Sequence, residues 1–187
     1  MSAVVLDDRL GAYQATSHLI EQGCRRIAHF AGPQHLNIYR NRQQGYLAAL
    51  QTYGLPYEEA LVLTSNMRLE DGAAGMEQLL ALPVDQRPDA LFSASDFALV
   101  GTLQVLKAQG LRVPQDVALA GFSNELFTSF TEPRLTSVDQ HCEQLGLETV
   151  RLCLEILATG VATFKPRRVV VQPQLLVRDS SSRLAFG

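Results

Sequence analysis

The chain has 187 residues, a formal net charge of −3, and 47% hydrophobic and 19% charged residues, which is the composition of a soluble globular protein. This length allows one domain, or one and a half, with a sizeable core. The acidic balance argues against the chain itself binding a phosphate backbone, and the apolar runs are too short to span a membrane.

Helical and strand patterns alternate along the first two thirds of the chain. Residues 9–22 have apolar side chains at helical spacing, and residues 27–31 form an apolar strand. The same patterns predict helices over 41–53, 71–82 and 97–109 and strands over 61–63, 90–94 and 117–122. Strands separated by such helices pair in parallel, and continuously apolar strands indicate helices on both faces. We therefore predict an α/β fold with a parallel open sheet.

Residues 110–122 mark one passage from helix to strand most clearly. Gly110 suits the left-handed conformation that closes a helix, and Pro114 prevents the helix from continuing. The apolar run from Val117 then ends at Ser123 and Asn124, where an open parallel sheet forms its ligand crevice.

The last third of the chain follows another pattern, with a long helix over 140–158 and strand-like pieces at 168–171 and 175–177. The long helix has two apolar stripes, so we expect it to have two neighbours. One stripe consists of Cys142, Leu145, Thr149, Leu152 and Ile156. The other consists of Leu147, Val150, Leu154 and Leu157. The helix over 97–109 also has little polar face, which leaves open burial in one domain or contact with a partner chain.

Polar side chains follow the four strands of the predicted sheet. Because the carboxyl ends of parallel strands share one edge, these loops should converge and form a ligand crevice. The loops contain Arg40, Asn41, Arg42, Ser65, Asn66, Met67, Arg68, Ser95, Asp96, Ser123, Asn124 and Glu125. Such groups suit a small ligand with hydroxyl, carboxylate or phosphate groups. A capping role for Ser95 or Asp96, and a solvated helix start for Arg40 and Arg42, remain alternatives.

Signatures of catalysis and metal binding are missing from the sequence. There is no Walker loop, no Gly-x-Gly-x-x-Gly, no Gly-x-Ser-x-Gly elbow and no metal-ligand spacing of His or Cys. We therefore expect no cofactor, no metal and no enzymatic activity. A dispersed triad of Ser123, His141 and Asp96 stays open as an alternative. Cys142 and Cys153 lie too far apart on one helix to form a disulfide, so we expect reduced thiols.

Six segments resemble, in order and spacing, the lactose/galactose-repressor (LacI/GalR) family of bacterial transcription regulators. They are RRIAHFAGP at 25–33, RNRQQGY at 40–46, PDALFSASD at 88–96, GLRVPQDVALAGF at 110–122, LTSVDQ at 135–140 and VVQPQLLVRDSS at 170–181. The resemblance implies a type I periplasmic-binding-protein-like fold, in which two α/β subdomains close over an effector. The chain would supply mainly the C-terminal subdomain.

The resemblance also implies a division of the chain. Residues 1–8 would be a remnant of the N-terminal subdomain or a crossover, and 9–138 the C-terminal effector subdomain. Residues 139–166 would hold a helix of the N-terminal subdomain, and 167–187 a tail that returns to the C-terminal subdomain. The DNA-reading helix-turn-helix domain and most of the N-terminal subdomain would lie outside this chain.

The function implied is the ligand-sensing, dimerising part of a cytoplasmic transcriptional repressor. It would bind a small polar effector such as a sugar, form a homodimer, and reach operator DNA only through the domain outside this chain, with no membrane partner. The absence of a secretory signal in residues 1–8 agrees with this location. A periplasmic solute-binding protein is the alternative, and an α/β hydrolase-like enzyme is the third possibility.

The resemblance assigns roles to individual residues. Arg42 matches the arginine that commonly binds the effector, Met67 stands where a stacking ring is frequent, and Ser123 replaces a common acidic residue. These departures remove a stacking face and a strong acceptor, so the effector is expected to differ from a plain hexose. The expected ligand-binding residues are Arg42, Arg40, Met67, Ser95, Asp96, Ser123 and Asn124. The expected dimer surface contains Leu99, Val100, Leu103, Phe127 and Phe130.

Overall fold

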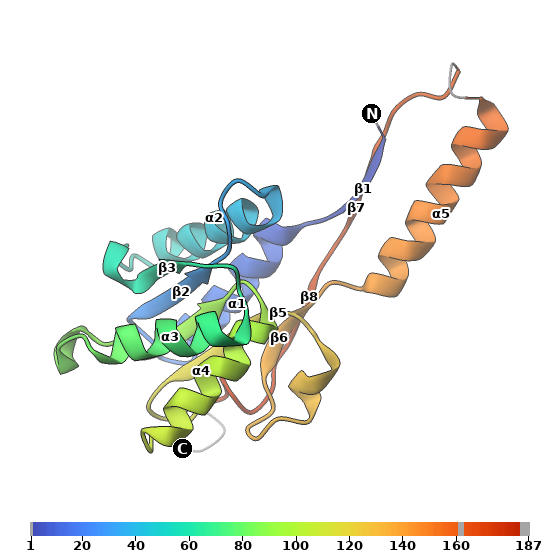
Figure 1. The fold of residues 1–187 in the computed structure, drawn as a ribbon. Helices are drawn as coiled ribbons and strands as arrows, with labels where there is room; N and C mark the ends of the chain where they lie inside the picture. Colours follow the sequence, from blue (N-terminus) through green and yellow to red (C-terminus); the bar gives the residue numbers. More distant parts are fainter. Residues whose placement is uncertain (1, 161–162, 184–187) are drawn as a thin grey trace.

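The computed structural model describes residues 2–160 and 163–183. It consists of a body, which is built on one large sheet, and an arm that projects from the body (Figure 1). The strands of the body are β2 (Ile27–Ala31), β3 (Val62–Thr64), β4 (Ala90–Ser93), β5 (Ala118–Ser123), β6 (Thr136–Asp139) and β8 (Gln174–Leu176). They form a six-stranded sheet in the order β3-β2-β4-β5-β6-β8, parallel except for β8. The predicted parallel open sheet is confirmed.

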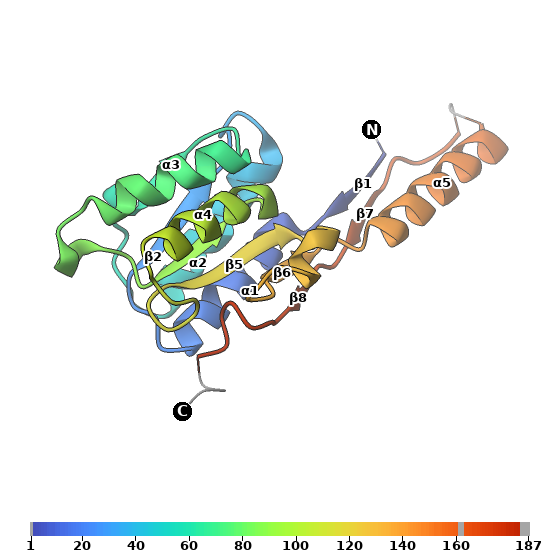
Figure 2. The same ribbon diagram turned by 60° about the horizontal axis from the view of Figure 1, so that its bottom comes forward.

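Two pairs of helices cover the two faces of this sheet, as predicted (Figure 2). One face carries α1 (Asp8–Glu21) and α2 (Asn37–Thr52), and the other carries α3 (Leu69–Leu80) and α4 (Asp96–Ala108). The strands supply both cores because successive side chains point to opposite faces. On β4, Leu91 belongs to the core beneath α3 and α4, whereas Phe92 belongs to the core beneath α1 and α2.

Short 3-10 helices interrupt the connecting segments of the body. They are η1 (Glu59–Leu61), η2 (Val84–Gln86) and η3 (Leu126–Ser129). The predicted helices are found within two residues of their expected bounds, except that α2 begins at Asn37 rather than near residue 41. The helix therefore begins about one turn earlier than the spacing of its apolar residues indicated.

The arm combines the two ends of the chain with the long helix. Strand β1 (Ala3–Leu6) pairs in parallel with β7 (Arg168–Val171), and α5 (Cys142–Thr159) packs against β1 (Figure 1). Leu152, from the first apolar stripe, is buried, whereas Leu147, Val150, Leu154 and Leu157, which form the second stripe, are exposed. Only one of the two expected neighbours of this helix therefore lies within the described residues.

The end of the chain returns from the arm to the body along β6. Ser180 Oγ accepts a hydrogen bond from the backbone N of Thr136 at 2.8 Å, and the backbone N of Leu119 donates to the carbonyl of Ser180 at 2.8 Å. These contacts extend to residue 183, and residues 184–187 of the predicted tail lie outside the described residues.

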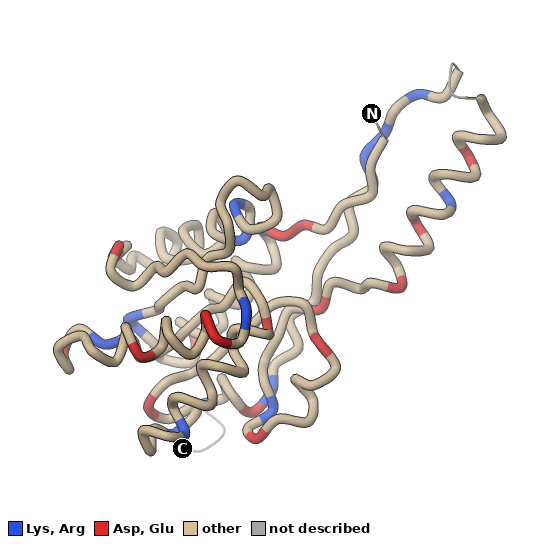
Figure 3. Tube along the Cα trace, in the orientation of Figure 1, with Lys and Arg blue, Asp and Glu red and all other residues tan. Residues whose placement is uncertain are grey.

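Charged residues of both signs are scattered over the body and the arm (Figure 3). The three cysteines are free thiols, with Cys24 buried and Cys142 and Cys153 exposed on α5. Within the described ranges, no helix is both long enough and apolar enough to cross a membrane.

Candidate functional site

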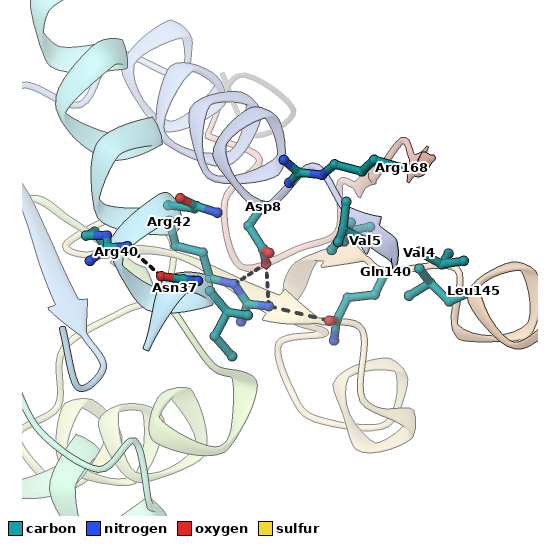
Figure 4. Close-up of a pocket in the computed structure, with 12 residues that line it drawn as sticks. Val4, Val5, Asp8, Asn37, Arg40, Arg42, Gln140, Leu145 and Arg168 are labelled. Atoms are coloured by element: carbon teal, nitrogen blue, oxygen red, sulfur yellow. Dashed lines mark hydrogen bonds and ion pairs between the residues drawn. The ribbon is translucent and has the colours of Figure 1, made fainter. Parts of the chain in front are cut away.

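A hollow of about 560 Å³ lies where the body meets the arm, at the carboxyl edge of the sheet (Figure 4). Its lining comes from β1, the first turns of α1 and α2, the segment between β6 and α5, and parts of α5 and β7. This is the edge at which the polar loops were predicted to converge. We therefore take this hollow as the candidate ligand site.

Arg42, on α2, is the most heavily bonded side chain of the hollow. Its Nε and Nη2 atoms lie 2.9 and 2.8 Å from Oδ1 of Asp8, and its Nη1 donates to the carbonyl of Ala94 at 2.8 Å. Nη2 also faces Oε1 of Gln140 at 3.4 Å, and the guanidinium carbon lies 3.6 Å from the ring centroid of Phe122. The guanidinium is thus fixed by a carboxylate on one side and an aromatic face on another.

The Asp8–Arg42 pair is nearly sealed from water, with side chains that are 8% and 5% exposed. Burial raises the pKa of Asp8 above its ordinary value, and the neighbouring Arg42 charge opposes that rise. Burial likewise lowers the pKa of Arg42 from its ordinary value, while the carboxylate of Asp8 raises it. Because a guanidinium is so basic, Arg42 remains cationic at neutral pH and the pair has almost no net charge.

Two polar groups of this pair remain without a hydrogen bond among the described residues. Asp8 uses only Oδ1 toward Arg42, which leaves Oδ2, and one of the two Nη1 hydrogens of Arg42 has no acceptor. Both residues line the hollow, as Figure 4 shows. The site therefore offers one strong acceptor on Asp8 and one strong donor on Arg42.

Asp96 and Asn124 lie at the same edge of the sheet but are held by internal bonds. The hydroxyl of Ser137 donates to Asp96 at 2.8 Å, and the backbone N of Glu125 donates to it at 3.0 Å. Asn124 accepts a hydrogen bond from Arg178 at 2.7 Å. Desolvation by burial raises the pKa of Asp96 to about 6. These bonds fix the loop after β5, so the structure gives both side chains a positioning role where the sequence suggested ligand contact.

The remaining predicted ligand residues occupy different surroundings. Met67 is only 4% exposed and packs in the core beneath α3 and α4, so it offers no open face for stacking. Ser95 and Ser123 are partly exposed at the edge, and their hydroxyls make no hydrogen bond within the described part of the chain. Arg40 is exposed and lines the hollow. The hollow thus brings together Arg40 and Arg42 of the predicted set.

Asp8 and Gln140 belong to the hollow but were missed as site residues. Asp8 follows Asp7, which caps α1 by accepting from the backbone N of Leu10, and only one acidic residue is needed for that role. The presence of a second acidic residue that the cap does not need was the signal in the sequence that could have identified Asp8 as a site residue. Gln140 ends the segment LTSVDQ that carried part of the family resemblance.

The side-chain cap by Ser95 or Asp96 and the dispersed triad are not realised, whereas Arg40 is exposed in the first turn of α2, as the alternative of a solvated helix start expects. Ser95 precedes α4 as its capping residue without a side-chain cap bond, and Asp96 is the first residue of the helix. Asp96 bonds to Ser137 rather than His141, whose Nδ1 lies 3.6 Å from Asp139. Ser123, His141 and Asp96 therefore form no hydrogen-bonded triad.

The residues predicted for a dimer surface differ in exposure. Leu99 is fully buried in the core of the body, which corrects its assignment to a surface, and Leu103 is almost fully buried. Val100 and Phe127 are partly exposed, and Phe130 is 78% exposed. The exposed ring of Phe97, which was not predicted, lies edge-on to Phe127 at 5.2 Å between centroids.

Comparisons with known proteins agree with this architecture. Residues 16–181 match the family described as periplasmic binding protein-like domain. The HTH-type transcriptional regulator CelR of Thermobifida fusca is 42% identical over 182 residues, which cover 96% of this chain and 52% of that protein. The chain thus spans about half the length of the curated relatives it matches.

Two solved structures share the fold. The transcriptional regulator CelR–cellobiose complex is 40% identical, with a TM-score of 0.87, over 96% of this chain and 54% of that one. A regulatory protein of the LacI family from Chloroflexus aggregans is 33% identical, also with a TM-score of 0.87, over 97% of this chain and 64% of that one. The resemblance found in the sequence is confirmed, and these relatives are named as regulators rather than enzymes or transport proteins.

Proposed function

This chain belongs to the periplasmic binding protein-like domain family, and on that premise we propose that it is the effector-sensing part of a LacI-type transcriptional regulator. The effector is a sugar or a related polar metabolite that binds in the hollow between body and arm. In this proposal residues 9–138 form the effector subdomain. Residues 1–8 and 139–166 belong to its N-terminal counterpart, and 167–187 return to the body.

The observation that carries this proposal is the buried guanidinium of Arg42 at the junction of body and arm. It contacts Asp8, which lies just after β1, and Gln140, which lies between β6 and α5. A ligand on Arg42 would therefore act on two segments that connect the body to the arm. A shift in that connection is the kind of change through which an effector alters a distant DNA reader.

We further propose that DNA contact is made by a helix-turn-helix domain and that the regulator acts in the cytoplasm as a homodimer. The dimer surface on the body includes Val100, Phe127 and Phe130, with Phe97 added beside Phe127. Large exposed apolar side chains close together support this choice, because such patches are typical of protein interfaces.

Thermal unfolding in the presence of sugars tests the proposed function. Cellobiose comes first because a relative was solved with it, followed by other disaccharides, hexoses, pentoses and nucleosides. A ligand at about 100 times its Kd stabilises the folded state by about 2.7 kcal/mol, which is a readily measured rise in Tm. If none of these compounds raises the Tm, the proposed function is wrong.

Substitution of Arg42 locates the site. In Arg42→Ala we expect the rise in Tm given by the effector to disappear, because the variant removes the central donor of the hollow. The comparison is made within each variant, with and without ligand, so that the lower stability of the variant itself cancels. Arg112→Ala is the matched control, since Arg112 is exposed and lies outside the hollow. An unchanged rise in Arg42→Ala would remove Arg42 from the site.

A further inference from the structure

We propose that Asp8 is a specificity-determining residue of the hollow, which favours effectors that present hydroxyl groups and disfavours effectors that carry a carboxylate or phosphate. This inference rests on the proposed function, because it concerns the ligand of the same hollow. It assigns the selection of the effector to the first residue of α1 and not to Arg42 alone.

The first argument is that Asp8 is available for this role. It is the first residue of α1, but Asp7 already caps the helix through its bond to the backbone N of Leu10. Asp8 instead turns toward α2 and places Oδ1 within 2.9 Å of both Nε and Nη2 of Arg42. A buried carboxylate that is not needed as a cap therefore has Arg42 as its main partner.

The second argument is the geometry that remains open. Oδ2 of Asp8 can accept a hydrogen bond, and one Nη1 hydrogen of Arg42 can donate one. A hydroxyl group can do both, so ligand hydroxyls fit this pair: one can accept from Arg42 and another can donate to Asp8. Both bonds involve a charged partner, which makes them stronger than bonds between neutral groups.

The third argument is charge. An anionic group placed against the guanidinium would also lie beside the carboxylate, because the two share a contact of 2.8 Å. The repulsion from Asp8 then offsets the attraction to Arg42, and both are strong in this buried position. Arg40 and Arg168 also line the hollow, but both are exposed and water screens their charges. The buried pair therefore dominates the discrimination.

Calorimetric titration with matched neutral and acidic sugars tests this proposal. The probes are cellobiose with cellobionate and glucose with gluconate, and the quantity measured is the ratio of the Kd of the acid to the Kd of the neutral sugar. For the wild-type chain we expect a ratio above 1. In Asp8→Asn, which keeps one oxygen acceptor and loses the charge, the ratio should fall at least tenfold. Asp8→Glu keeps the charge and should retain most of the preference.

Asp85→Asn is the matched control, because it removes one exposed carboxylate remote from the hollow, and it should leave the ratio unchanged. An unchanged ratio in Asp8→Asn, with binding intact, overturns the role of Asp8 and leaves the proposed function standing. If Asp8→Asn does not fold, the wild-type chain still decides, since equal or tighter binding of the acids overturns the proposal. Binding of no probe to the wild-type chain overturns the proposal, and the wider thermal-unfolding series then decides separately whether the proposed function stands.

Discussion

The buried pair of Asp8 and Arg42 should show strong coupling in a double-mutant cycle. Arg42→Met keeps most of the aliphatic stem but leaves the carboxylate of Asp8 unpaired at 8% exposure, and loss of one partner of a buried pair costs about 3–5 kcal/mol. Asp8→Asn should cost less, about 2 kcal/mol, because Arg42 keeps its bond to the carbonyl of Ala94 and its contact with Phe122. The double variant removes both charges, so it should lose at least about 2 kcal/mol less than the sum of the single variants.

Urea unfolding followed by circular dichroism at pH 7 measures the three free energies of unfolding. The exposed pair of Arg112 and Asp116 is the control, and its coupling should be small because water screens both charges. The loss in Arg42→Met should also shrink as the pH falls toward 5, because burial raises the pKa of Asp8 and a protonated carboxyl needs no counter-ion. A coupling at the buried pair no larger than that of the control pair would refute the reasoning.

Two further predictions concern the body and the arm. Burial raises the pKa of Asp96 to about 6 in the folded chain, against 3.8 in the unfolded reference. The protonated carboxyl is therefore favoured by folding, and this stabilisation is complete below pH 4 and is lost as the pH rises through 6. Between pH 5 and pH 7, the free energy of unfolding of the wild type, measured with urea, should therefore fall by about 1 kcal/mol more than that of Asp96→Asn. An equal pH dependence of the two proteins would contradict this prediction. Gly101→Ala would place its methyl group 1.9 Å from the carbonyl oxygen of Leu69 and should lower stability by about 2 kcal/mol, whereas Gly146→Ala, with open space around it, should raise it by up to about 1 kcal/mol. Thermal unfolding of both variants is the measurement, and stabilisation by Gly101→Ala would show that α3 and α4 can separate without cost.

The parallel strands could be predicted because each is an apolar run between a helix end and a polar loop. Two other strands lacked that signal. β6 contains Thr136, Ser137 and Asp139, and the polar side chain of Thr136 is buried because the returning tail supplies partners, including Ser181 Oγ at 2.6 Å. β1 is a short strand whose register partner for Ala3 is Arg168, and a pairing between the two ends of the chain leaves no trace in local periodicity.

The position of the site could be predicted better than its contacts. Parallel topology alone places the ends of β2, β4 and β5 along one edge, so the convergence of polar loops followed from the sequence. Which carboxylate meets which donor depends on side-chain packing. Asp96 and Asp8 both begin helices at that edge, yet Asp96 is bound by Ser137 and Asp8 by Arg42. Only the folded chain distinguishes a carboxylate that fixes a loop from one that faces the hollow.

The contacts of Arg42 also indicate which of its hydrogen bonds an effector would replace first. The bonds to Asp8 and Ala94 are 2.8–2.9 Å long, whereas the approach to Gln140 is 3.4 Å and is the weakest of the set. Gln140 is neutral and only partly buried, so its replacement by a ligand hydroxyl leaves no charge unpaired. One hydrogen bond to a charged group is worth about 1.5–3 kcal/mol, which corresponds to a roughly 10- to 150-fold change in an equilibrium. A ligand hydroxyl can therefore replace Gln140 at Arg42 while the Asp8–Arg42 pair stays intact.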